Sequence, residues 1–140
     1  LNNRQLTLTF NDAQLALVGV RDESFPNEVP LSNPISDDTP LLLLAHHPEY
    51  FEQYLTSNPM IQPDITFSGH AHGGQIRLPL IGPLYSPGQG FFPKYTTGIY
   101  TSEKDPTKQL VVSRGIGNSV FPFRINNKPH LLIITLERKN

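Results

Sequence analysis

Several features are missing from this sequence of 140 residues, and each absence excludes a class of function. It contains no cysteine, which excludes disulfides and thiolate zinc sites without fixing a cellular compartment. Its net charge of −1 offers no electrostatic basis for a nucleic-acid scaffold role or for binding anionic lipid. No apolar run is long enough to span a bilayer, and no signal peptide opens the chain. We therefore expect a cytoplasmic or peripheral membrane protein whose targeting signals are not in this chain.

Proline and glycine, by contrast, are abundant, with 14 and 10 copies. This composition predicts one loop-rich domain with short strands and a modest core. Alternating and continuous apolar residues at 5–10 and 14–20 predict a hairpin whose second strand is buried on both faces. The polar, proline-rich residues 21–40 predict an irregular connection with at most a turn of helix, its acidic side chains in solvent. Further strands are predicted at residues 97–101, 109–113 and 131–136.

The middle of the chain predicts a strand–helix–strand unit. Residues 41–45 (LLLLA) and 64–68 (DITFS) are apolar or β-prone, and residues 48–57 carry a one-sided apolar stripe that begins with a proline. Strands joined by a helix in this way should lie parallel and adjacent, in a right-handed crossover. Their carboxyl ends then meet at one edge of the sheet, where open α/β sheets bind ligands.

Histidines follow both of these strands. His46 follows the first, and residues 69–75 (GHAHGGQ) follow the second with His70 and His72 two positions apart. In an extended backbone residues i and i+2 point to the same side, about 6.5–7 Å apart, so the two rings could bind one metal ion or one ion each. Three converging histidines favour a metal site over a solvated turn. His47 is expected to point away from His46 towards the rim, and His130 to be structural or exposed.

Other residues in or near this motif could either contact a substrate or have a structural role. Gly73 and Gly74 would let a substrate or another part of a protein approach the backbone. Gln75 could donate to a phosphate oxygen or satisfy a buried loop carbonyl. Arg114, in a glycine-rich bend after a strand, could bind phosphate as a bidentate donor or form a structural salt bridge.

The segment at 79–94 (PLIGPLYSPGQGFFPK) is long and unusually apolar for a loop. We expect its apolar side chains to be buried against its own domain, because a long loop must be anchored. The alternative is an apolar rim beside the metals, suited to a lipid-like substrate or a membrane surface.

Residues 44–48 (LAHHP) and 69–75 resemble the last two motifs of the calcineurin-like metallophosphoesterases. Residues 81–84 (IGPL) and 113–117 (SRGIG) resemble one bacterial branch, some of whose members associate with membranes. The resemblance implies a phosphodiesterase or phosphomonoesterase, a hydrolase that uses a metal-activated hydroxide. It also implies that His46 and His70 bind one ion and His72 the other. Imidazole and oxygen ligands suit Mn, Fe, Ni or Zn.

The sequence also departs from that family, because its Asp-x-His, Gly-Asp-x-x-Asp and Gly-Asn-His-Asp/Glu motifs do not occur here. These motifs supply the bridging carboxylate, further ligands and the catalytic histidine. We therefore expect residues 1–140 to be a fragment, the C-terminal half of a four-layer α/β (α+β) sandwich, mostly β with one βαβ crossover. Its expected partners are a phosphoester substrate and the N-terminal half of the same enzyme.

Taken alone, this chain is expected to bind at most one metal ion, to hydrolyse nothing efficiently and to associate with itself through its bare sheet face. Two rival functions remain. One is a mononuclear zinc hydrolase in which His46, His70 and His72 are the only protein ligands. The other is a metal-binding or interaction module without catalysis.

Overall fold

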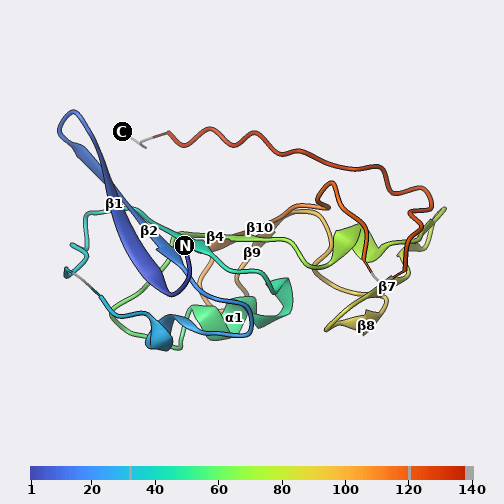
Figure 1. The fold of residues 1–140 in the computed structure, drawn as a ribbon, viewed down its shortest axis with the longest axis horizontal. Coiled ribbons are helices and arrows are strands. Elements are labelled where there is room, and N and C mark those ends of the chain that lie inside the picture. Colours follow the sequence, from blue (N-terminus) through green and yellow to red (C-terminus); the bar gives the residue numbers. More distant parts are fainter. Residues whose placement is uncertain (32, 120, 138–140) are drawn as a thin grey trace.

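The computed structural model describes residues 1–31, 33–119 and 121–137, and its central feature is a six-stranded mixed sheet (Figure 1). The strand order is β1-β2-β3-β4-β10-β9, and few helical turns accompany it. The predicted α/β class, mostly β, is therefore confirmed. The strands of this sheet are β1 (Arg4–Phe10), β2 (Ala13–Gly19), β3 (Leu41–Leu44), β4 (Ile65–Ser68), β9 (Gly98–Thr101) and β10 (Gln109–Val112).

The β1–β2 hairpin forms as predicted, with Phe10 paired to Ala13 across a two-residue turn. Its turn residue Asn11 has φ +53°, a conformation that asparagine tolerates better than most residues. Only the second half of β2, from Ala16 onward, is well buried, because that half pairs with β3 while the first half projects beyond the sheet. The expectation of burial along the whole strand is wrong for this reason. The connection at 21–40 contains one short 3₁₀ turn, η1 (Pro26–Glu28).

The crossover between β3 and β4 is also confirmed, since the two strands are adjacent and parallel with Leu42 opposite Ile65. The helical part is shorter than the predicted residues 48–57. It consists of η2 (Pro48–Tyr50) followed directly by α1 (Phe51–Tyr54). Beyond α1 the hydroxyls of Thr56 and Ser57 donate to helix carbonyls, a local bonding pattern that competes with continued helix.

The crossover helix fastens one face of the sheet, because α1 places one aromatic ring in each of two core clusters. Tyr54 lies with Val18, Leu41 and Leu43 under β2 and β3. Phe51 is completely buried with Leu110 and Val112 of β10 and with Tyr95. Each cluster therefore joins the start of the crossover to a different part of the sheet, and the loops at the carboxyl ends of β3 and β4 are held on a rigid base.

Residues 77–91 form two small ribbons instead of a buried loop. They are β5 (Arg77–Leu78) with β6 (Gly82–Pro83), and β7 (Tyr85–Ser86) with β8 (Gly90–Phe91). The expected burial of the apolar side chains is wrong, because two-residue ribbons have no second layer over them. The exposed large side chains here are Leu80, Ile81, Tyr85, Phe91 and Phe92.

The predicted strand at 131–136 is absent. The described residues 131–137 carry no strand, and only a single bridge joins Gly115 to His130 just before them. The apolar residues are present, but a strand also needs a neighbouring backbone, and this segment runs apart from the sheet edges (Figure 1). Leu131 and Ile133 are accordingly more than 80% exposed. Across the described residues, no helix has both the length and the apolar character needed to cross a membrane.

Candidate metal centre

Two loops at neighbouring strand ends form the site. The loop after β3 carries His46 and His47, and the loop after β4 begins with Gly69 and His70. Backbone hydrogen bonds continue the pairing of the strands into the loops: Ala45 N–H donates to the Phe67 carbonyl at 3.0 Å, and Gly69 N–H to the His46 carbonyl at 3.2 Å. The two loops therefore stay side by side, and the sequence-predicted convergence of His46 with His70 occurs, with ring centroids 4.9 Å apart.

His47 is the residue that the sequence analysis misplaced. Its ring is buried and its centroid lies 4.0 Å from that of His70, so it belongs to the site and not to the rim. Its Nε2 lies 2.8 Å from Oδ1 of Asp22, and its Nδ1 lies 3.0 Å from Oε1 of Glu49. The fixed turn at Pro48 brings Glu49 back under the ring, which the identity of the neighbouring residues alone could not show.

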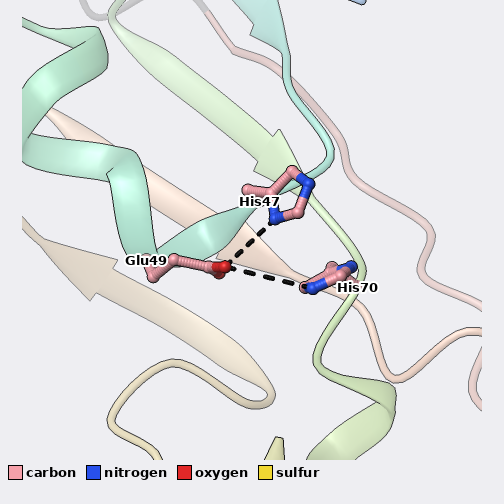
Figure 2. A group of neighbouring side chains, drawn as sticks. All are labelled: His47, Glu49 and His70. Carbon is pink, nitrogen blue, oxygen red and sulfur yellow. Dashed lines mark hydrogen bonds and ion pairs between the residues drawn. The ribbon is translucent and has the colours of Figure 1, made fainter. Parts of the chain in front are cut away.

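Glu49 links the two loops (Figure 2). Its Oε1 lies 3.0 Å from His47 Nδ1 and 3.9 Å from His70 Nε2. His47, Glu49 and His70 form the only group in the described part of the chain whose three possible ligand atoms all lie within 4.8 Å of one another. The sequence analysis missed Glu49 altogether; its one signal was an acidic residue three positions after the histidine that follows β3.

His72 lies elsewhere in the second loop. The backbone around it is not extended, since His70, His72 and Gln75 have φ of +57°, +45° and +51°. The argument that positions i and i+2 share a side therefore does not apply to this loop. The Nδ1 of His72 lies 3.3 Å from the Gly117 carbonyl. Burial lowers the pKa of His72, the bond to Gly117 opposes this, and the nearby charges of Arg124 and His46 lower it further.

Side chains from other parts of this chain pack closely against Gly73 and Gly74 of the motif. A Cβ at Gly73 would lie 2.3 Å from Oδ1 of Asn127 and 2.7 Å from the Arg114 side chain, and one at Gly74 would lie 2.3 Å from Pro83. The buried Asn127 also donates to the carbonyls of His72 and Gln75. Arg114 thus reaches the motif, and its buried Nε has no hydrogen-bond partner among the described residues. Of the two interpretations of Arg114, the structural salt bridge is absent from the described part of the chain, and phosphate binding stays a prediction.

Comparison with known proteins places these loops in a family. The chain is 35% identical, over 76% of its length, to the uncharacterized metallophosphoesterase YkuE of Bacillus subtilis. It is 29% identical over 97% of its length to the phosphodiesterase YaeI of Escherichia coli, and 25% identical over 99% to an uncharacterized metallophosphoesterase of Aquifex aeolicus. This chain belongs to the metallophosphoesterases.

This metallophosphoesterase chain spans about half or less of the length of those relatives. It spans 34% of the length of YkuE, 49% of YaeI and 48% of the Aquifex protein. No family model matches the sequence, and no solved structure matches it with significance.

The site fits the divalent metal ions that the family name implies. The Glu49 Oε2 is buried and has no hydrogen-bond partner among the described residues, and its negative charge beside the histidines favours a cation nearby. Burial lowers the pKa of His70, the charges of His47 and His46 act in the same direction, and the carboxylate of Glu49 partly opposes them. At neutral pH His70 therefore keeps a nitrogen lone pair, which a metal ligand requires. Imidazole nitrogen is a donor that suits transition metals.

Proposed function

We propose that this metallophosphoesterase chain is the C-terminal half of an enzyme that hydrolyses phosphomono- or phosphodiesters at a binuclear metal centre. The observation that carries the proposal is the meeting of histidines from two loops at the carboxyl ends of β3 and β4, beside a buried carboxylate. Relatives named metallophosphoesterase and phosphodiesterase support the reaction class. The catalytic histidine and the bridging carboxylate come from the other half of the enzyme.

In this proposal each residue of the chain has a limited task. His46 and His70 hold one ion, and His72, on the adjacent 3₁₀ turn η3 (His72–Gly74), holds the other. When bound, the ions supply a hydroxide nucleophile near neutral pH and offset charge on the phosphoryl oxygens. Manganese, iron, nickel and zinc all suit these ligands.

Arg114 and Gln75 orient the substrate. The aliphatic part of Arg114 packs against Gly73, so its guanidinium stays beside the motif, where it would donate to a phosphate oxygen. Gln75 is buried in the same loop, and its backbone is fixed by Asn127 and by the amide of Ile125. Its side-chain amide would donate to the same anionic group.

Removal and return of metal tests the proposal. We expect the full-length enzyme to lose hydrolysis of bis(p-nitrophenyl) phosphate after chelation and to regain it with Mn²⁺ or Zn²⁺, binding two ions per chain by elemental analysis. His72→Ala should retain one ion. A full-length protein that binds no metal, or that hydrolyses phosphoesters equally well without it, would contradict the proposal. One ion in the active wild type would favour the mononuclear zinc hydrolase.

The sheet face opposite α1 exposes apolar side chains, which favours the proposal that the N-terminal half packs there. Residues 131–134 leave an open apolar pocket of 460 Å³ over Phe67 and Val111, and Leu44 and Ile99 are exposed. In the intact enzyme this face would pack against the preceding half. A second apolar surface, on the ribbons at 77–91, is the part of the chain best suited to meet a membrane or a lipid-like substrate.

The chain of 140 residues by itself should behave differently from the enzyme. Two divalent ions about 4 Å apart repel by roughly 16 kcal/mol at an effective dielectric of 20, and here no bridging carboxylate offsets that repulsion. We expect purified chain to bind at most one ion, to show only trace phosphodiesterase activity and to elute larger than a monomer in size-exclusion chromatography. An active monomer with two tightly bound ions would refute this expectation.

A further inference from the structure

The carboxylate of Glu49 is sealed inside the site by a turn that comes from another part of the chain. The turn between β7 and β8 places Gly88 against it: a Cβ at Gly88 would lie 1.9 Å from Glu49 Oε1 and 2.8 Å from its Cδ. Gly88 has φ +74°, so glycine is favoured here both by backbone conformation and by lack of space. With this cover the Glu49 side chain is only 12% exposed.

The sealing turn is itself fastened to the core. The side-chain amide of Gln89 donates to the Tyr95 carbonyl at 2.8 Å, and its oxygen accepts from the Tyr95 amide at the same distance. Tyr95 packs in the cluster that contains Phe51, the first residue of α1, which lies two positions after Glu49. Both sides of the contact between Gly88 and Glu49 are therefore anchored in one cluster, which holds the carboxylate at a fixed place.

Glu49 is also held from the opposite side. His47 Nδ1 lies 3.0 Å from Glu49 Oε1, while His47 Nε2 lies 2.8 Å from Asp22, so the ring bridges two carboxylates. Because both of its ring nitrogens contact carboxylate oxygens, His47 holds the Glu49 side chain in position and is not free to bind a metal ion. The remaining neighbour of Glu49 Oε1 is His70, whose Nε2 lies 3.9 Å away.

We propose that Glu49 is a positioning residue that fixes the tautomer and orientation of His70. A carboxylate facing Nε2 favours the proton on that nitrogen, which leaves the lone pair on Nδ1 for a metal ion. Histidines that bind metals generally hold a carboxylate or carbonyl on their other nitrogen, and loss of that partner weakens metal binding about 10–100-fold. The inference rests on the proposed metal-binding function of His70, and it adds Asp22, His47 and Gly88 as the groups that keep Glu49 in place.

Two pairs of variants of the full-length enzyme test this role. Glu49→Gln removes the carboxylate at constant size, and its control is Glu52→Gln, on the same crossover, where the carboxylate accepts from Ser102 and the Glu103 amide outside the site. Gly88→Ala pushes on Glu49, and its control is Gly90→Ala, whose φ of +75° is equally strained but whose Cβ would meet nothing within 4 Å.

The readouts are Zn²⁺ affinity by competition with a chelating dye and the ring ¹⁵N signals of His70 in zinc-loaded, histidine-labelled enzyme. We expect Glu49→Gln to weaken Zn²⁺ binding about 10–100-fold and to remove the slowly exchanging Nε2–H signal of His70. Gly88→Ala should change both readouts in the same direction, and both controls should match the wild type. If Glu49→Gln does not fold, the comparison of Gly88→Ala with Gly90→Ala decides alone.

The inference is overturned if Glu49→Gln and Gly88→Ala match their controls while the wild type binds zinc. It is also overturned if Glu49→Gln weakens Zn²⁺ binding while the His70 signals of its zinc-loaded form stay unchanged, since Glu49 would then act as a ligand. A wild-type enzyme that binds no zinc and hydrolyses no phosphoester would instead refute the proposed function.

Discussion

His70→Ala in the full-length enzyme is expected to lower kcat/KM for bis(p-nitrophenyl) phosphate by three orders of magnitude or more. His70 lies beside the histidines of the neighbouring loop: its ring lies 4.9 Å from that of His46 and 4.0 Å from that of His47, and its Nε2 faces Glu49. Its removal deletes a proposed metal ligand and leaves the Glu49 carboxylate with His47 as its remaining histidine neighbour. A loss of about 4 kcal/mol of transition-state stabilisation corresponds to roughly a thousandfold lower rate.

The matched control is His130→Ala. His130 is held to Gly115 by its backbone amide, a bond that alanine preserves, and it lies outside the loops that carry the site. We expect this variant to keep wild-type kcat/KM and metal content. Steady-state kinetics on enzymes of equal metal loading separates the two variants. Near-normal turnover by His70→Ala would remove His70 from the metal centre.

Phe51→Ala is expected to lower the free energy of unfolding by about 3–5 kcal/mol. Phe51 is fully buried, and its ring fills the cluster formed by Leu110, Val112 and Tyr95. Alanine would leave a cavity between the crossover and β10, in the same cluster that anchors the turn over Glu49. Chemical denaturation of the full-length protein measures the change, and the slope with denaturant should stay constant.

Phe92→Ala provides the comparison for the same chemical change at an exposed position. Phe92 is 66% exposed on the ribbon side of the molecule, and its truncation should change the free energy of unfolding by less than about 0.5 kcal/mol. Equal destabilisation by the two variants would show that the cluster around Phe51 does not support the fold.

Some elements followed from local pattern alone. The apolar run at β3, the β-prone segment at β4 and the proline that starts the crossover are contiguous signals, and the parallel pairing then follows from chain connectivity. The hairpin and the strands β9 and β10 followed in the same way. The residues at 131–136 show the limit of this reasoning, because an apolar run of this kind can describe one strand, whereas a sheet needs a second strand beside it.

The candidate metal centre also depends partly on local sequence and partly on tertiary contacts. The sequence by itself determined that His46 and His70 follow adjacent parallel strands, and so that their rings meet. It could not determine the loop conformation at 69–75, where the positive φ values of His70, His72 and Gln75 are set by tertiary contacts. Asn127, more than fifty residues further along the chain, donates hydrogen bonds to the carbonyls of His72 and Gln75.

The partners of each imidazole were likewise decided only by the tertiary structure. Glu49 enters the site because a 3₁₀ turn reverses the chain after Pro48, and Asp22 and Gly88 reach the same cluster from distant loops. The physical reason is that a side chain's identity sets its chemistry locally, whereas its neighbours are set by packing between segments far apart in sequence. The histidines proposed to bind metal could therefore be named from the sequence, but the buried carboxylate beside them became apparent only from the fold.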